Sequence, residues 1–89
     1  MAKKIVTIIG GNSNISEHAQ NQAFELGKKI LDNGWLLCTG GRSGVMESAS
    51  KGARTSEKWT GTQIIGILPD GEKNAGNEYL DIIIPSGIG

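Results

Sequence analysis

The sequence is poor in the residues that bind metals and form cross-links. Its 89 residues include one cysteine, Cys38, and one histidine, His18. A single cysteine cannot form an internal disulfide, which is typical of proteins from a reducing compartment. Structural zinc sites use four Cys or His ligands, so we expect no metal site. We interpret Cys38 as a core residue, because the chain has no second histidine to activate its thiol as a nucleophile.

Net charge and long apolar runs are also absent. Nine basic and nine acidic residues cancel, so no overall field attracts the chain to nucleic acid or to an anionic membrane. The amino-terminal run after the two lysines of MAKKIVTIIGGN is too short for a signal peptide or a membrane span. We therefore expect a cytoplasmic protein that binds no membrane, for which a nucleic-acid partner is disfavoured.

Glycine, in contrast, is abundant: the chain has 14, whereas a typical domain has about 7 % glycine. The glycines gather at the ends of four short apolar runs, which are residues 5–9, 35–38, 63–68 and 81–84. Near-continuous apolar runs that are rich in branched residues are typical of strands in a parallel sheet covered on both faces. The glycines therefore mark the ends of ordered elements.

Two helices are predicted between the first three runs. Residues 16–33 form the first, with Ser16 as N-cap and Gly34 in the left-handed position after its end. Its expected buried stripe is Ala19, Ala23, Leu26 and Ile30. The second helix covers residues 43 to about 56 and is expected to turn four small side chains inward, namely Val45, Ala49, Gly52 and Ala53.

This order predicts an α/β fold, a Rossmann-like open parallel sheet with strand order 3-2-1-4 and two helices on one face. Residues 1–89 then form a single domain that resembles the amino-terminal half of a larger doubly wound one. The sequence supplies no helices for the second face of the sheet. We expect that face to be covered either by the rest of a longer domain or by self-association, and we expect a homo-oligomer.

The loops that follow the four strands meet at one edge of such a sheet, where ligands bind. Glycines let a ligand approach the backbone, and the free N–H groups at a helix start attract anions. Residues 41–46 are therefore the best candidate for a phosphate site, with Arg42 as charge partner. The alternative is that Gly40 and Gly41 only turn the chain while Ser43 caps the helix. Glu47 either serves the helix dipole alone or also faces the ligand edge.

Two standard nucleotide motifs are missing. Neither glycine-rich loop matches G-x-G-x-x-G, and no G-x-x-x-x-G-K-[ST] occurs in the chain. A conventional dehydrogenase is therefore disfavoured, and a P-loop triphosphatase is excluded at the level of motifs.

Four segments together resemble one superfamily. They are VTIIGGN (residues 6–12), ILDNGWLLCTGGRSGVMESASKGA (30–53), IGILP (65–69) and IPSG (84–87). The chain resembles the amino-terminal half of the LOG (lysine-decarboxylase-like, SLOG) superfamily, and most of all its branch of molybdenum cofactor carrier proteins. The resemblance covers essentially all 89 residues. It implies a Rossmann-like fold, dimers or tetramers, and a nucleotide or pterin-phosphate cofactor bound at the carboxyl edge of the strands.

The resemblance and the loop positions together define the candidate cofactor-binding residues. They are Gly10, Gly11, Asn12, Ser13, Gly40, Gly41, Arg42, Ser43, Gly44, Val45, Met46, Ser86 and Gly87. We assign no catalytic residue.

Activity is harder to assign, because part of the family pattern is missing. Some members hydrolyse cytokinin nucleoside monophosphates, and these carry Gly-Leu-Met-Gly where this chain has residues 44–47, GVME. Their second motif, P-G-G-x-G-T-x-x-E, is absent from the 89 residues. We therefore expect a carrier or binding domain for a phosphate-bearing small molecule, either a nucleotide or the molybdenum cofactor, without turnover. The alternative is a fragment of a nucleoside 5′-monophosphate phosphoribohydrolase. A likeness to the DNA-processing branch is disfavoured by the zero net charge.

Overall fold

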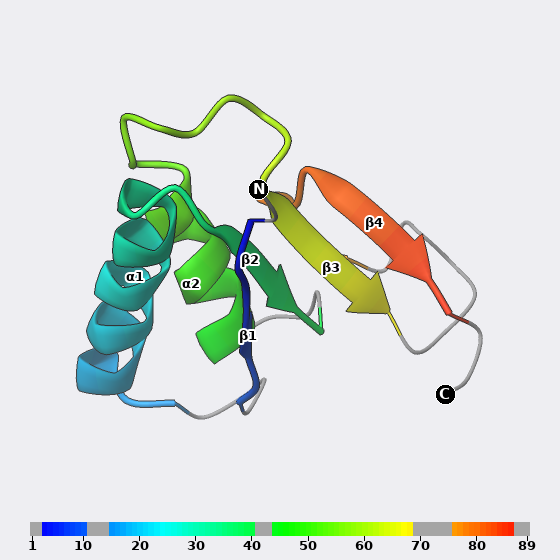
Figure 1. Cartoon of the computed structure of the whole chain (residues 1–89). Coiled ribbons are helices and arrows are strands. Elements are labelled where there is room, and N and C mark those ends of the chain that lie inside the picture. Colours follow the sequence, from blue (N-terminus) through cyan, green and yellow to red (C-terminus); the bar gives the residue numbers. More distant parts are fainter. Residues whose placement is uncertain (1–2, 11–14, 41–43, 69–75, 87–89) are drawn as a thin grey trace.

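The computed structural model describes residues 3–10, 15–40, 44–68 and 76–86. Strands and helices alternate up to the third strand, and a fourth strand follows (Figure 1). The elements in chain order are β1 (Ile5–Ile8), α1 (Glu17–Asp32), β2 (Leu36–Thr39), α2 (Val45–Ala53), β3 (Ile64–Leu68) and β4 (Ile82–Pro85). Each predicted strand is confirmed to within one residue at either end. No helix among the described residues is long and apolar enough to cross a membrane.

The four strands form one parallel sheet in the order β1-β2-β3-β4. The predicted 3-2-1 array is confirmed, but the place of the fourth strand is wrong. Instead of returning beside β1, β4 pairs with β3, with Gly66 opposite Ile83. Backbone hydrogen bonds tie both ends of this pair, from Asp81 N to Ile64 O (2.8 Å) and from Ser86 N to Leu68 O (2.8 Å). The sheet therefore grows in one direction, and β1 and β4 lie at opposite edges.

Helix α1 begins and ends as predicted. The Ser16 side chain accepts a hydrogen bond from Ala19 N (3.0 Å), and Gly34 has a φ of 78° just beyond the C-cap Asn33. The predicted buried stripe is partly wrong, because the Leu26 side chain is 48 % exposed. The buried residues of the helix are Ala23, Gly27, Ile30 and Leu31. The inward face is therefore rotated toward Gly27 and Leu31, because α1 packs against α2 as well as against the sheet.

Helix α2 is shorter than predicted, since it begins at Val45 and ends at Ala53. Its N-cap is Gly44, which has a φ of 75° and no side chain to cap the helix. Ser43, the cap in the alternative interpretation of this segment, lies outside the described residues. Of the predicted inward residues, Ala49, Gly52 and Ala53 are buried and Val45 is half-buried. The row of small residues lets the helix lie close to its neighbours.

The two helices touch each other through glycine. A Cβ atom built on Gly27 would overlap Ala49 O and lie 2.7 Å from the Ala49 carbonyl carbon. A Cβ atom built on Gly52 would likewise overlap Phe24 O and lie 2.6 Å from the Phe24 carbonyl carbon. The contact is reciprocal: Gly27 faces the peptide group of Ala49, which lies three residues before Gly52, and Gly52 faces that of Phe24, which lies three residues before Gly27. The backbones of α1 and α2 are in direct contact, with no room for a side chain at either position.

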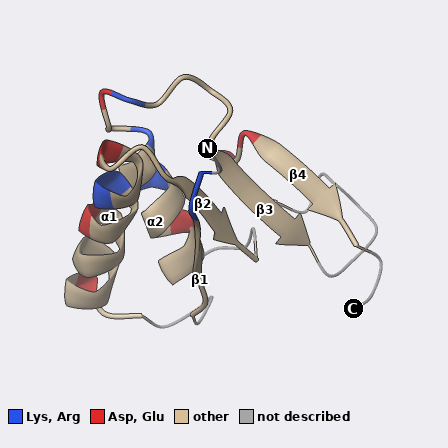
Figure 2. Cartoon of the chain, in the orientation of Figure 1, with Lys and Arg blue, Asp and Glu red and all other residues tan. Residues whose placement is uncertain are grey.

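Both helices cover the same face of the sheet. Ile8, Leu37 and Ile64 point to this face from the first three strands, and they share one buried cluster with residues of both helices. Among the described residues, charged side chains lie on the helices, on the connection after α2 and just before β1 and β4, whereas β3 and β4 themselves carry none (Figure 2). Among the described residues, no helix packs against the opposite face.

A polar cluster joins the end of α1 to the turn after α2. Ser56 Oγ donates to Asp32 Oδ1 (2.5 Å), and Lys28 Nζ donates to Asp32 Oδ2 (3.0 Å). The Ser56 hydrogen bond, followed by the one from Lys28, lowers the pKa of the Asp32 carboxyl group. The same Asp32 contact raises the pKa of Lys28. This cluster fixes the two helices at the end farthest from the start of α2.

Candidate functional site

Five of the six predicted site residues that the structure describes, all except Ser86, gather where α2 begins. β1 and β2 are parallel neighbours, so their carboxyl ends lie side by side, followed by Gly10 and Gly40. Gly44, Val45 and Met46 form the start of α2 at the same edge. The structure thus brings together Gly10, Gly40 and the start of α2, as the sequence predicted.

The space beside Gly10 and Gly40 is occupied by other side chains of the same chain. A Cβ atom built on Gly10 would lie 2.9 Å from Val45 Cβ, and one on Gly40 would lie 2.9 Å from Met46 Sδ. Both contacts are too tight for a real Cβ atom, so glycine lets the first turn of α2 lie against the strand ends. At these two positions the small residue makes room for the protein's own helix.

The start of α2 offers backbone N–H groups that no side chain caps among the described residues. The first N–H groups of any helix have no partner within the helix, and the N-cap Gly44 has no side chain to bond to them. The positive end of the helix dipole and these donors favour an anion. Glu47 occupies the first turn and places a negative charge beside the same donors. It stabilises the helix, and it also opposes any bound anion.

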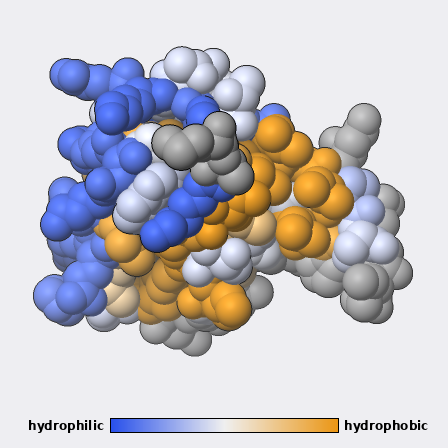
Figure 3. Space-filling view, in the orientation of Figure 1, coloured by the Kyte–Doolittle hydropathy of each residue, from blue (hydrophilic) through white to orange (hydrophobic). Residues whose placement is uncertain are grey.

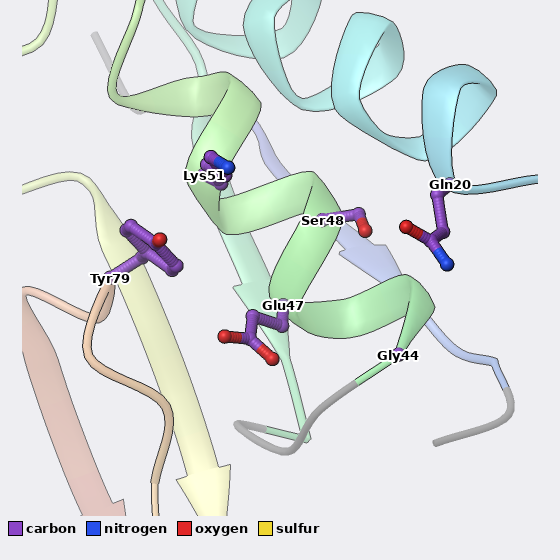
Figure 4. A pocket seen from close by; sticks show the side chains of 6 residues that line it. All are labelled: Gln20, Gly44, Glu47, Ser48, Lys51 and Tyr79. Atoms are coloured by element: carbon purple, nitrogen blue, oxygen red, sulfur yellow. The ribbon is translucent and has the colours of Figure 1, made fainter. Parts of the chain in front are cut away.

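A groove of about 280 Å³ runs along α2 away from this start. Gln20 contributes from α1, Tyr79 faces α2 from the segment before β4, and α2 itself supplies the rest (Figure 4). The residues from α2 and its N-cap are Gly44, Glu47, Ser48 and Lys51. The structure therefore gives Glu47 a place in this groove on the outer side of α2.

An arginine that the sequence analysis did not single out fixes one wall of the groove. Arg54 follows α2 directly and donates from Nε to Tyr79 O (3.0 Å) and from a terminal nitrogen to Glu78 O (3.2 Å). The same guanidinium lies 3.7 Å from the Asp81 carboxylate and stacks 4.9 Å from the centre of the Trp59 ring. Arg54 thus holds the segment before β4 against the end of α2.

Asp81 anchors this arrangement to the sheet. Its Oδ2 accepts hydrogen bonds from Trp59 Nε1 (2.7 Å), Ile64 N (3.1 Å) and Gln63 N (3.2 Å). Its side chain is 4 % exposed. The carboxylate therefore joins the beginnings of β3 and β4 to the crossover from α2, which explains why β4 lies beside β3.

The remaining predicted residues are not brought into the same place. Ser86 follows β4, which is the outer strand of the sheet on the side away from β1. Its N–H and Oγ both donate to Leu68 O. Three strand spacings of about 4.8 Å separate β4 from β1. Seven predicted residues lie outside the described part of the chain, namely Gly11, Asn12, Ser13, Gly41, Arg42, Ser43 and Gly87.

Sequence reasoning missed the groove residues Gln20, Ser48, Lys51 and Tyr79. Ser48 and Lys51 lie one turn apart on α2, a polar stripe that was readable from the sequence. Gln20 and Tyr79 carry no such signal, because their positions depend on how α1 and the segment before β4 pack.

Comparison with known proteins places the whole chain in one group. The model of the SLOG cluster4 family matches residues 3–89. An uncharacterised protein of Archaeoglobus fulgidus is 33 % identical over 79 residues, which is 89 % of this chain and 49 % of that protein.

Solved structures give the same result at the level of the fold. The molybdenum cofactor binding protein of the phototrophic bacterium Rippkaea orientalis is similar with a TM-score of 0.88 and 39 % identity, over 100 % of this chain and 53 % of that one. The Moco carrier protein of Chlamydomonas reinhardtii is similar with a TM-score of 0.80 and 38 % identity, over 99 % of this chain and 52 % of that one. The chain thus spans about half the length of the relatives it matches.

Proposed function

We propose that this chain, which belongs to the SLOG cluster4 family, forms one half of a binding site for a phosphate-bearing cofactor of the molybdenum cofactor type and holds it without chemical turnover. The family membership and the carrier-like neighbours confirm the resemblance drawn from the glycine-rich segments. The ligand and the absence of turnover are the proposal.

The observation that carries the proposal is the start of α2. Its donors lie at the shared carboxyl edge of β1 and β2, and the fold around them matches that of a molybdenum cofactor binding protein with a TM-score of 0.88. A phosphate at this point would accept hydrogen bonds from the N–H groups of Val45 and Met46 in the first turn of the helix.

The residues fit the phosphate end of such a cofactor. Gly44 leaves the helix start without a side chain in the way, and Val45 and Met46 are braced by Gly10 and Gly40. The chain's part is to bind and orient the phosphate through its backbone, while the pterin end of the group would carry the metal chemistry. Glu47 weakens this anion site by its charge, which favours a carrier that must also release its ligand.

A first experiment tests the anion site with inorganic phosphate and AMP as probes. In the ¹⁵N-labelled chain, both are expected to shift the amide resonances of Val45, Met46 and Glu47. Glu47→Gln should raise phosphate affinity about two- to five-fold, because a charge in the first turn of a helix is worth about 0.3–1 kcal/mol. Glu25→Gln on α1 is the matched control and should leave the affinity unchanged. Unmoved resonances at the start of α2, or equal effects of the two variants, would contradict the site.

A second experiment separates carriage from hydrolysis. The chain is incubated anaerobically with molybdenum cofactor released from a molybdoenzyme, and molybdenum is measured in the protein fraction after gel filtration. In parallel it is incubated with AMP, and free adenine is measured by chromatography. Retained molybdenum without adenine is the expected result. Adenine release that Glu47→Ala abolishes would support the hydrolase alternative and refute the carrier.

A further inference from the structure

The groove on the outer side of α2 is lined by two opposite charges. Glu47 and Lys51 are four residues apart, so their side chains lie on the same face of the helix. Among the described residues, neither belongs to an ion pair. A carboxylate and an ammonium group therefore stand next to each other in the groove, and both can bind a ligand.

An aromatic ring forms one wall of the same groove. Tyr79 is half-buried and faces α2 from the segment before β4 (Figure 4). The Arg54 guanidinium lies 5.7 Å from the centre of the Tyr79 ring and donates to Tyr79 O (3.0 Å). These contacts hold the ring in place before a ligand arrives, so a planar group can stack on it at a low entropic cost.

The size of the groove suits one small ring system. Its volume of about 280 Å³ lies just below the range of about 300–1,000 Å³ that is typical of sites for drug-sized ligands. Ser48 and Gln20 add a hydroxyl and an amide group to the charged pair. The groove begins at the N-cap Gly44, so a ligand with its phosphate at the start of α2 can extend its ring along the helix.

We propose that this groove binds a flat heterocycle through an edge that carries a carbonyl group, a ring N–H group and an amino group in a row. Guanine and the pterins share this edge. The Glu47 carboxylate accepts hydrogen bonds from the two neighbouring N–H donors, and the Lys51 ammonium group donates to the carbonyl oxygen. Tyr79 stacks on the ring, as aromatic side chains do when proteins bind single bases. This assignment rests on the proposed function, because the pterin end of the proposed cofactor carries the same edge.

The charges of the groove distinguish this edge from that of adenine. Adenine presents an amino group beside an unprotonated ring nitrogen, so a carboxylate placed there meets one donor and one acceptor. Both oxygens of Glu47 meet a donor on the edge of guanine or a pterin, and hydrogen bonds to a charged group are the strong ones. Glu47 opposes a phosphate at the helix start, so it adds to the affinity only when the ring supplies these donors.

The outer surface of α1 repeats the charges without the ring. Glu25 and Lys29 have the same four-residue spacing and line a hollow to which, among the described residues, α1 alone contributes. Hydrophilic side chains cover α1, whereas apolar ones gather over the strands (Figure 3). Within the described part of the chain, no aromatic ring from another element lines that hollow. Glu25 and Lys29 are therefore a matched control pair with no wall on which a heterocycle can stack.

Three nucleotides that carry the same phosphate test the edge. GMP has the carbonyl, ring N–H and amino groups, IMP lacks the amino group, and AMP has neither the carbonyl nor the ring N–H group. Amide shifts of the ¹⁵N-labelled chain give the three dissociation constants at one ionic strength. We expect GMP to bind about ten-fold more tightly than AMP, with IMP in between, because each added hydrogen bond to a charged group contributes to the affinity. Equal affinities for the three nucleotides would overturn the proposal.

Variants assign this preference to particular side chains. Glu47→Gln should raise the affinity for inorganic phosphate but lower the preference for GMP over AMP to about two-fold, because the amide loses the charge and keeps one acceptor. Glu25→Gln should change neither quantity. Tyr79→Leu should weaken binding of all three nucleotides about five- to ten-fold and leave inorganic phosphate unaffected, whereas Tyr79→Phe keeps the ring and should bind like the parent. Circular dichroism verifies that each variant is folded, and a preference for GMP that survives Glu47→Gln would refute the assignment.

Ligands without phosphate separate this proposal from the proposed function. Neopterin and guanosine carry the edge, and adenosine does not. Tighter binding of neopterin identifies a pterin as the ring, tighter binding of guanosine identifies a guanine nucleotide, and adenosine binding as tightly as both overturns the proposal. If phosphate shifts the amides of Val45 and Met46 while the three compounds bind equally, the groove assignment is wrong and the anion site stands. If neopterin or guanosine binds preferentially while phosphate shifts no amide, the groove assignment stands and the anion site is wrong.

Discussion

Replacement of Gly27 by alanine provides a sharp test of the helix contact. In an isolated helix this change would be favourable by about 1 kcal/mol, because glycine is the poorest helix former after proline. In this protein the new methyl group would overlap Ala49 O and lie 2.7 Å from the carbonyl carbon of Ala49. The two effects have opposite signs, so the sign of the measured change in stability decides which one operates.

The packing effect should dominate. Non-bonded carbon atoms prefer separations of about 3.5–4.0 Å, so the backbones of α1 and α2 must move apart by on the order of 1 Å. Ala23, Ile30 and Leu31 of α1 share the buried cluster and would move with it. Overpacking of this kind costs about 1–3 kcal/mol or more. The overlapped atoms belong to the backbone and cannot rotate away, so we take the upper part of this range, about 2–3 kcal/mol. After the gain of about 1 kcal/mol in helix propensity, we expect a net loss of about 1–2 kcal/mol in the free energy of unfolding.

Urea denaturation followed by circular dichroism measures this loss. Gly34→Ala is the matched control, because nothing lies within 4 Å of its Cβ position and its φ of 78° alone opposes the change. The control should cost about 1–2 kcal/mol through its backbone conformation, without a change at the helix contact. The double variant Gly27→Ala, Gly52→Ala should lose less than the sum of the single losses, because one separation of the helices relieves both overlaps. A Gly27→Ala protein as stable as the parent, or more stable, would refute the contact.

Three other changes test separate parts of the fold. Ser50→Ala should stabilise the protein by about 1 kcal/mol or more, because the buried Ser50 hydroxyl has no hydrogen-bond partner among the described residues; a loss of stability in thermal unfolding would contradict this. Arg54→Met should lower the stability by about 1–3 kcal/mol and increase amide exchange at Tyr79, since the carbonyl groups of Glu78 and Tyr79 lose their donor. Unchanged exchange at Tyr79 would show that Arg54 does not hold this segment in place. The pKa of Asp32 is lowered in the folded protein by Ser56, so this carboxylate stabilises the fold above the ordinary pKa of about 3.9 and the effect is lost as pH falls through the lowered value. Asp32→Asn should therefore reduce the difference between urea midpoints at pH 7 and pH 3, and an unchanged difference would show that the group contributes nothing.

Local signals in the sequence were sufficient for the bounds of the strands and of α1. The apolar runs and their glycines predicted each strand, and Ser16 and Gly34 predicted both ends of α1 because caps act through neighbouring residues. The place of β4 was not predictable in the same way. It depends on the Asp81 carboxylate, whose partners Trp59, Gln63 and Ile64 lie 17 to 22 residues away.

The meaning of the glycines also changed once the packing was known. From the sequence, Gly10 and Gly40 are predicted to face a ligand, whereas in the structure Val45 and Met46 lie against them. A glycine that admits a ligand and one that admits a helix look identical in the sequence. The resemblance to a family points to these residues as a candidate site, and the packing of α2 shows that the glycines also support the helix start.

The order of the strands has a consequence for synthesis on the ribosome. Each of β2, β3 and β4 pairs with the strand that precedes it in the sequence, so no pairing requires a strand that is synthesised later. All pairings of this sheet can form as the chain emerges, and domains generally fold from the amino-terminal side during translation. The exposed isoleucines of the strands, Ile5, Ile67, Ile82 and Ile84, are then accessible to other molecules from the moment the sheet is made. We therefore expect the nascent chain to be a substrate for chaperones that recognise apolar surface.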